Sequence, residues 1–549
     1  MLNESDFFIA TTITVLLIRQ RPSAGDLRVN GASRLVLLAF VTCWLVAATV
    51  GMASNLGAAY SSNEFLRPDN ALRLAKGLLG ALVLLPFLRQ RQRSHGDAVT
   101  LLGWGLAAGL GVVTLVVLAE RALFAGILDF AGDYRVAGPF SSMRVGGGHI
   151  GAYAALALPF AVCLSRLRPL WLGTGLAMLA FSLGFYTIVI TFARTAYAAC
   201  LVATIATGLG CLFVANRRRI GSLIAGVAPV ALIVATLAVA AAFTGMHERF
   251  AATATDFVTR QQNWQAGLAV RDRDLPATMF GMGLGTYQRT MLMRSPVNRP
   301  SDLVLERDDL GTYASMRVET PFFLGQKITL PLAGAMHLSL RVRSGDERAV
   351  EGQAALGSVI CDKVLLYSDN CRGSETKLIE PKTWTSVQVT VPASGLGSRT
   401  LFGLLRRPVE LSLYGPVGHR LEVRDIGLTD DSGVSLLANG DFAHGLDRWI
   451  FTDDSHVSWR MLNQYLMLFF ETGILGLAAF LALAGLAIAG GIQALRGGSP
   501  AGAAVAGAVA GFLVSGLSDN ILEAPRVATL FFLICCCGLM QWEARSGGQ

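Results

Sequence analysis

The stretch DDSHVSWRMLNQYLMLFFETGILGL, residues 453–477, joins two kinds of sequence. It begins with two aspartates, a histidine, a tryptophan and an arginine, and its second part is mainly apolar and carries only one charge, Glu471. The apolar part continues beyond residue 477 and is long enough to cross a hydrocarbon core of about 30 Å as a helix. We therefore expect a cluster of ionisable residues at the mouth of a membrane helix.

The rest of the chain also has the composition of a membrane protein. Of its 549 residues, 53% are hydrophobic and 15% are charged, whereas soluble proteins have about 25% charged residues. A short apolar run at 6–18 lacks the small-residue cleavage site of a signal peptide, so we interpret it as a short or tilted span. The run 119–131 is expected to form a re-entrant or interfacial helix. Ten further spans are predicted at about 33–53, 71–88, 99–118, 148–165, 171–190, 195–214, 221–243, 463–490, 500–518 and 525–541.

The arginines predict the orientation of these spans. Cytoplasmic loops of membrane proteins carry an excess of lysine and arginine. The arginine-rich stretches fall in alternate loops, which also accounts for part of the net charge of +8 without a nucleic-acid partner. These stretches are 19–34, 89–93, 165–169 and 216–219. The segments 54–70, 119–147, 191–195, 244–460 and 519–524 are then predicted to lie outside, in the periplasm.

Residues 244–460 follow a different pattern from the spans. Polar and apolar residues alternate in HLSLRV (337–342), SVQVTV (386–391), VELSLY (409–414) and LEVRDIGL (421–428), with turn residues between them. This period of two is typical of an antiparallel sandwich. We predict an all-β sandwich over about 312–450, inserted between a transmembrane bundle (1–243) and C-terminal transmembrane helices (461–549).

The sequence of the insert resembles that of a jelly-roll carbohydrate-binding module. TWTSVQVTVP (383–392) and LEVRDIGLTDD (421–431) are similar to late strands of such modules, and LLANGDFAHGLDRW (436–449) is similar to an opening strand. Here that strand comes last, but the first and last strands of a jelly roll are often neighbours, so it can close the same sheet. Both glycan binding and a role as spacer or lid stay open for this domain.

Cysteine usage separates the same two regions. Seven of the nine cysteines lie in apolar spans, where cysteine behaves as a small hydrophobic residue. Cys361 and Cys371 lie in the insert, and an oxidising compartment would let them form a disulfide. No CxxC or Cys/His spacing predicts a metal site, and we expect no metal and no cofactor.

FGMGLGTY (280–287) imitates a dinucleotide-binding fingerprint, but no βαβ unit surrounds it, so we interpret it as a turn.

Cationic residues gather at the helix mouths on the predicted outer side. Each alone is explained by a membrane anchor or a helix cap, but together they go against the orientation rule. Ionisable groups at membrane depth are costly and usually functional, and arginine matches the geometry of a pyrophosphate. These residues are Arg144, His149, Arg194, Arg260, His456 and Arg460.

The order of several motifs resembles the O-antigen ligase and polymerase family of bacterial envelope glycosyltransferases. The motifs are GGGHIGAYAALALP (146–159), TFARTAYAA (191–199), RQQNWQAGL (260–268) with FGMGLGTY, and NQYLMLFFETGILGLAAFLAL (463–483). The resemblance implies a polytopic fold of the GT-C type. It also implies metal-independent transfer of a glycan from undecaprenyl diphosphate to a hydroxyl of a glycan, lipid or protein acceptor, at the outer face of the inner membrane.

The resemblance assigns catalytic roles to Arg194 and Arg260. The family's catalytic histidine usually precedes the asparagine of HNxYL, but here Leu462 stands before Asn463. The nearest histidine is His456, which we predict to be the general base. Predicted substrate-binding residues are Arg144, His149, Asp453, Arg460 and Asn463. Two alternatives stay open: His149 as the base, or His456 and Asp453 as parts of a cap on the helix that follows.

Three other functions compete with this hypothesis. Ligase and polymerase activity share donor chemistry, so the sequence does not separate them. A glycan-lipid transporter would need charges in the middle of its spans, and the sequence has few. A membrane-anchored carbohydrate-binding protein would need fewer spans than ten.

Overall fold

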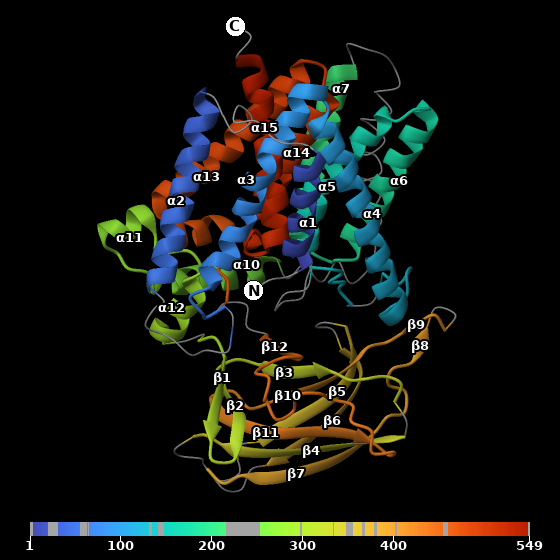
Figure 1. Ribbon diagram of the computed structural model, residues 1–549, viewed down its shortest axis with the longest axis vertical. Coiled ribbons are helices and arrows are strands. Elements are labelled where there is room, and N and C mark those ends of the chain that lie inside the picture. Colours follow the sequence, from blue (N-terminus) through green and yellow to red (C-terminus); the bar gives the residue numbers. More distant parts are fainter. Residues whose placement is uncertain are drawn as a thin grey trace.

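A computed structural model describes most of the chain as a helical bundle and a β-sandwich, one below the other in Figure 1. The predicted span 221–243, Arg144 and His456 lie outside the described residues. The described residues are 4–19, 31–54, 63, 65–130, 134–140, 148–215, 253–296, 299–332, 334–346, 355–364, 368–377, 382–400, 403–453 and 459–546.

The described part of the bundle contains eight helices that are long and apolar enough to cross a membrane, as in a multi-pass membrane protein. They are α2 (Gly31–Ser54), α3 (Asn70–His95), α4 (Ala98–Phe124), α5 with η2 (Gly148–Ala157 and Leu158–Arg166), α6 (Leu170–Val189), α7 (Arg194–Ala215), α13 (Gln464–Arg496) and α15 (Pro525–Ser546). Each coincides with a predicted span. The predicted span 500–518 is the shorter helix α14 (Pro500–Ser515).

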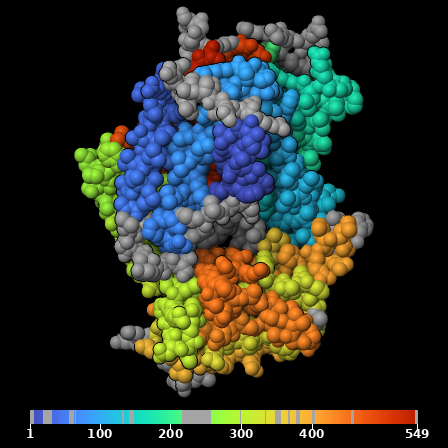
Figure 2. All heavy atoms as spheres, in the orientation of Figure 1, coloured from blue at the N-terminus to red at the C-terminus, as the bar shows by residue number. Residues whose placement is uncertain are grey.

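Helix α14 fills the centre of the bundle. It packs against α7 through glycines, since a Cβ atom on Gly507 would lie 2.6 Å from the Ala203 carbonyl oxygen and one on Gly511 would lie 2.8 Å from that of Ala199. Small residues let membrane helices approach this closely. In contrast, α1 (Glu4–Arg19) lies on the outside of the bundle (Figure 2), where its Phe7 and Phe8 are exposed.

Arginines of the predicted cytoplasmic loops lie at the end of the bundle away from the sandwich. Arg89 Nη2 lies 2.6 Å from Glu543 Oε2, near the end of α15, and Figure 1 shows α15 reaching that end of the bundle. Arg166 Nη1 donates to Thr100 Oγ1 at 3.3 Å, at the start of α4. The loops that carry Arg89 and Arg166 and the inserted sandwich therefore occupy opposite ends of the bundle.

The sandwich consists of two five-stranded antiparallel sheets. The first has the order β1 (Asp302–Asp308), β2 (Gly311–Val318), β11 (His419–Asp430), β4 (Ala335–Ser344) and β7 (Thr385–Pro392). The second has the order β12 (Trp449–Asp453), β3 (Phe322–Lys327), β10 (Val409–Tyr414), β5 (Ala355–Lys363) and β6 (Ser368–Lys377). Leu338, Leu340 and Val342 of β4 are buried in alternation with exposed neighbours, which confirms the predicted pattern.

The edges of the sandwich differ from the prediction in detail. It begins at Asp302, earlier than the expected residue 312, because β1 forms a hairpin with β2. The segment 436–449 contributes only Trp449 to a strand, at the start of β12, which pairs with β3. The rest of that segment is a loop whose Phe442 packs against Trp449 in the core. Cys361 of β5 and Cys371 of β6 are joined by a disulfide.

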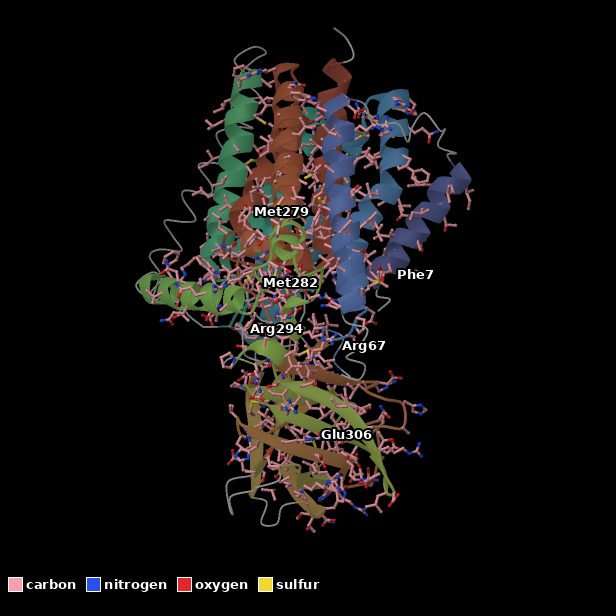
Figure 3. The ribbon with its side chains drawn as sticks, turned by 90° about the vertical axis from the view of Figure 1, so that its left-hand side faces the viewer. Phe7, Arg67, Met279, Met282, Arg294 and Glu306 are labelled. Atoms are coloured by element: carbon pink, nitrogen blue, oxygen red, sulfur yellow. A yellow bond between two sulfur atoms is a disulfide. The ribbon has the colours of Figure 1, made fainter. Side chains whose placement is uncertain are left out.

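In the described part of the connection from the bundle to the sandwich there are three helices: α10 (Thr253–Ala269), α11 (Leu275–Phe280) and α12 (Tyr287–Arg294). Figure 3 shows α10 lying across the end of the bundle that faces the sandwich. Trp459 packs between Phe65 and Phe451, with ring centroids 6.1 and 5.8 Å away. This contact fixes the last strand of the sandwich to the loop before α3.

The expectation for residues 119–131 is wrong over its described part. Residues 119–124 are the last turns of α4, and 125–130 form no helix. The end of α4 supports the sandwich instead, since Arg407 Nε donates to the Leu123 carbonyl oxygen at 2.6 Å.

Candidate functional site

The segment Leu517–Glu523, which joins α14 to α15, lies at the centre of the candidate site. It ends in the short helix η3 (Ile521–Glu523). We call it the 517–523 turn. Side chains from α3, α10 and the start of α13 bind it, and three of the candidate residues, Arg260, Arg460 and Asn463, contact it.

Arg260 and Arg194 approach each other beside this turn. Arg260 Nη1 donates to the Ser518 carbonyl oxygen at 2.8 Å, and Arg194 forms an ion pair with Asp256 of α10. Burial lowers the pKa of the Arg260 guanidinium, the negative charge of Asp519 raises it, and the nearby charge of Arg194 lowers it again. Arginine stays charged under these conditions. Because water is partly excluded, charges interact more strongly here than in bulk water, and an anionic ligand would compete with Asp256 and Asp519 for the two guanidinium groups.

Asp519 of the same turn lies beside the start of α5. A Cβ atom on Gly148 would lie 1.6 Å from Asp519 Oδ2, so the carboxylate lies against the first residue of α5. A negative charge is favourable at the N-terminus of a helix. His149, the next residue of α5, is buried. The structure therefore places Asp519, whose charge acts on Arg260, against Gly148, the residue before His149.

Arg460 lies on the other side of the turn. Its Nε and Nη2 atoms lie 2.6 and 3.2 Å from the two carboxylate oxygens of Glu523, and both side chains are buried. Arg73 Nη1 also donates to the Glu523 carbonyl oxygen at 3.0 Å. These contacts make Arg460 a residue that positions the turn.

Asn463, another predicted binding residue, has a structural role. Asn463 caps α13, since its Oδ1 accepts from the backbone N–H groups of Tyr465 and Leu466 at 3.0 and 3.1 Å. Its Nδ2 donates to the Leu517 carbonyl oxygen at 3.3 Å.

Asp453 belongs to the sandwich. It is buried at the end of β12, where its carboxylate accepts from Thr320 Oγ1 at 2.7 and 2.8 Å and from the Ser301 N–H at 3.2 Å. The N-cap of α13 is therefore Asn463 and not Asp453.

The glycine-rich stretch 280–287 is a turn, as predicted. Gly281, Gly283 and Gly285 all have positive φ angles, of 82°, 101° and 72°. A Cβ atom on Gly281 would lie 2.3 Å from the Glu471 carbonyl carbon, and one on Gly283 would lie 2.5 Å from the Gly51 nitrogen. The turn is therefore wedged between α2 and α13.

This turn satisfies backbone groups at a kink in α13. Gly473 has a non-helical conformation with φ of 67°. The Met282 N–H donates to the Phe470 carbonyl oxygen at 2.8 Å, and the Gly283 N–H donates to that of Glu471 at 3.1 Å. The Gly285 N–H donates to Glu471 Oε1 at 2.8 Å. Glu471, the one charged residue in the apolar run of 463–477, is thus held by a hydrogen bond from this turn.

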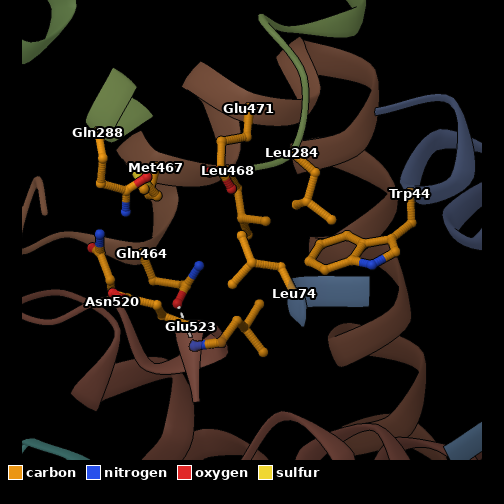
Figure 4. Close-up of a pocket in the computed structure, with 11 residues that line it drawn as sticks. Trp44, Leu74, Leu284, Gln288, Gln464, Met467, Leu468, Glu471, Asn520 and Glu523 are labelled. Atoms are coloured by element: carbon orange, nitrogen blue, oxygen red, sulfur yellow. Dashed lines mark hydrogen bonds between the residues drawn. The ribbon is translucent and has the colours of Figure 1, made fainter. Parts of the chain in front are cut away.

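A pocket lies between the kinked start of α13 and the 517–523 turn (Figure 4). The cavity is small, with a volume of about 20 Å³. Its polar lining comes from Gln288, Gln464, Glu471, Asn520 and Glu523. Its apolar lining comes from Trp44, Leu74, Leu284, Met467, Leu468 and Leu522.

Sequence reasoning missed Asp256, Asp519 and Glu523. The signal was present for the last two, because the turn LSDNILE places two carboxylates between adjacent spans of a chain with few charges. No group of three or more histidine, cysteine, aspartate or glutamate residues that could hold a metal ion occurs in the described part of the chain. In comparisons with known protein families and with curated proteins, no family model and no curated protein matches this chain.

Proposed function

We propose that the protein transfers a glycan from undecaprenyl diphosphate to an acceptor hydroxyl at the outer face of the bacterial inner membrane. The single observation that carries this proposal is the meeting of Arg194 and Arg260 beside the 517–523 turn. They come from α7 and α10 and lie at the end of the bundle that faces the sandwich. Two partly desolvated guanidinium groups at the end of a membrane bundle suit a diphosphate whose lipid stays in the bilayer.

The proposed reaction is a displacement at the anomeric carbon of the donor glycan. A bond forms between this carbon and the acceptor oxygen, while its bond to the diphosphate oxygen breaks. Undecaprenyl diphosphate leaves with the electron pair, and the proton of the acceptor hydroxyl passes to a general base. The arginines stabilise the negative charge that develops on the departing diphosphate.

Two histidines compete for the role of general base. An imidazole accepts a proton near neutral pH. His456 lies outside the described residues, in the connection between β12 and α13. His149 is the described candidate, and its neighbour Gly148 contacts the Asp519 carboxylate.

The test is reconstitution of the reaction. The donor is the lipid-linked glycan that accumulates in a strain from which the gene is deleted, and the full chain is purified into lipid nanodiscs. The expected result is a glycosylated acceptor together with an equal amount of released undecaprenyl diphosphate. A glycan-lipid transporter would instead move the intact donor across a vesicle membrane without cleavage, and this result would overturn the proposal.

A further inference from the structure

A short hairpin of the sandwich reaches the rim of the bundle. It consists of β8 (Arg399–Thr400) and β9 (Leu405–Arg406), which pair in antiparallel fashion. Figure 1 shows it just below the end of α4. Arg407 fixes its base there, since Nε donates to the Leu123 carbonyl oxygen at 2.6 Å and the guanidinium carbon lies 5.4 Å from the centre of the Phe124 ring. The hairpin is therefore attached to the last residues of a membrane span.

The length of α4 places these residues at the level of the lipid headgroups. Its 27 residues make a helix of about 40 Å, which matches the thickness of a bilayer with both headgroup layers, about 40–45 Å. A helix that starts at the cytoplasmic headgroups therefore ends at those of the outer leaflet. Tyr186, near the end of α6, donates from its hydroxyl to the Ile127 carbonyl oxygen at 2.7 Å. The residues that follow α4 are thus held at the ends of two spans.

Exposed apolar side chains lie on this rim. Leu404, in the turn of the hairpin, is 80% exposed, and Leu128, four residues after the end of α4, is 79% exposed. In sequence, LFGLL (401–405) contains no polar side chain, whereas turns are usually rich in polar residues. A single exposed leucine needs no explanation, but these two lie where the spans leave the bilayer. Apolar side chains flanked by arginines are typical of segments that lie in the membrane interface.

Two arginines stand directly opposite each other in the hairpin. Arg399 of β8 and Arg406 of β9 are partners in the strand register, so their side chains leave the same face of the ribbon, and like charges in this position are destabilising. The stretch 399–407 contains no acidic residue, and its third arginine, Arg407, is paired with Asp369 at 2.8 Å. An anion bound between Arg399 and Arg406 would offset their repulsion, and the guanidinium group matches the geometry of a phosphate.

We infer that the β8–β9 hairpin docks on the outer leaflet of the membrane, with Leu404 among the lipids and the headgroup of an anionic phospholipid bound by Arg399 and Arg406. This partner fits both parts of the hairpin, because its phosphate suits the arginines and its acyl chains suit the leucine. The contact gives the sandwich a support beside α4, in addition to the packing of Trp459 on Phe65 before α3. It does not depend on the proposed reaction.

The experiment places a nitroxide label on the hairpin of the full chain in lipid nanodiscs. Leu404→Cys carries the label. The control is Leu310→Cys in the turn between β1 and β2, because Leu310 is also exposed, by 59%, and Figure 1 shows that hairpin running away from the bundle. The native free cysteines lie in the spans, and the unsubstituted protein measures how far they react.

The nanodiscs contain phosphatidylcholine with increasing fractions of phosphatidylglycerol, which is anionic. Electron paramagnetic resonance then compares collisions of the label with oxygen, which concentrates in lipid, and with a water-soluble nickel chelate. With phosphatidylglycerol present, the label at position 404 should collide more with oxygen, whereas the control label should collide more with the chelate at every composition.

The arginines are tested in the Leu404→Cys background. Arg399→Gln and Arg406→Gln should each raise the phosphatidylglycerol fraction needed for half of the effect by about 5-fold, the usual worth of one arginine at an anionic surface. Arg307→Gln, at an exposed position of β1, is the matched control and should leave this fraction unchanged.

Three outcomes would overturn the inference. If the label at position 404 meets the chelate as freely as the control label does, the hairpin stays in water. If it meets neither reagent, protein covers the turn. If its contact with lipid is the same at every composition and in both arginine variants, Arg399 and Arg406 bind no headgroup.

Discussion

Arg460 and Glu523 form a bidentate ion pair, with Nε–Oε2 and Nη2–Oε1 distances of 2.6 and 3.2 Å. Both side chains are buried, and the pair fixes the start of α13 to the 517–523 turn. Breaking a buried pair by removing one partner typically costs about 3–5 kcal/mol, since it leaves a charge without compensation. We therefore expect Glu523→Gln to lower the free energy of unfolding by roughly this amount.

The control for this prediction is an exposed pair near the same end of the bundle. Arg294 Nη1 lies 2.6 Å from Asp272 Oδ1, and each side chain is about half exposed. Exposed pairs contribute about 0.2–1 kcal/mol, so Asp272→Asn should change stability little. Denaturant unfolding of both variants in detergent makes the comparison. Equal losses in the two variants would show that the Arg460–Glu523 pair does not hold the turn.

A second prediction concerns Arg194 and Arg260. Arg194→Ala and Arg260→Ala should each lower the transfer rate by about 100- to 1,000-fold, the usual effect of removing one group that stabilises developing charge. Lysine should restore little, because an ammonium group lacks the planar fork of arginine. Transfer from the purified donor is the measurement, with folding checked by size-exclusion chromatography.

Arg67→Ala is a suitable control for the arginine variants, because Arg67 is exposed and pairs with Asp69 at 3.2 Å just before α3. It should retain full activity. Wild-type rates in both Ala variants of Arg194 and Arg260 would mean that these arginines only anchor their helices.

Some of this site follows from the sequence and some does not. Arg194 and Arg260 stand out because cations on the predicted outer side go against the orientation rule. The positive φ angles of 280–287 follow from its glycines. The burial of Arg460 does not follow, because its partner Glu523 is 63 residues away and reaches it only through the packing of α13 and α15. Asp453 looked like a helix-mouth residue, but strand pairing with β3 places it inside the sandwich.

A third prediction concerns the pH dependence of the sandwich. Glu410 is buried between two lysines, with Lys363 Nζ 2.5 Å and Lys327 Nζ 2.8 Å from its carboxylate oxygens. Burial raises the pKa of the Glu410 carboxyl, and the two lysines lower it. Their combined effect is larger than that of burial, so the pKa lies below its usual value. A lowered folded-state pKa gives stability that is present above the unfolded pKa of about 4.3 and is lost as the pH falls through the folded pKa.

Glu410→Gln should remove this part of the pH dependence. The variant should be less stable than wild type at pH 7, by about 3–5 kcal/mol, because the Lys363 ammonium is left buried without its partner. The difference should shrink as the pH falls through and below the usual range of a carboxyl. Denaturant unfolding from pH 7 down to pH 3, followed by tryptophan fluorescence, measures it. A difference that is constant over this range would contradict the assignment.

A fourth prediction concerns the side of the membrane. The sandwich lies at the end of the bundle away from Arg89 and Arg166, so a reporter inserted at residue 350 should be active in the periplasm. Cys361 and Cys371 should then be protected from a maleimide unless the protein is first reduced. A cytoplasmic reporter signal would contradict the orientation and the proposed mechanism together. Labelling of both cysteines without reduction would contradict only the disulfide.

The last prediction separates the two candidate bases. A positioned general base contributes about 100- to 10,000-fold in rate, so its replacement by alanine should slow single-turnover transfer by that factor and leave donor binding to the arginines unchanged. His456→Ala and His149→Ala are measured in parallel, with His444→Ala in the exposed loop before β12 as the control. We expect the loss in His456→Ala, because His456 stands nearest in sequence to the start of α13. A loss only in His149→Ala would move the base to α5, where Gly148 already contacts the Asp519 carboxylate. If neither variant slows the chemical step, no histidine acts as base, and a carboxylate beside the arginines has to take the proton from the acceptor hydroxyl.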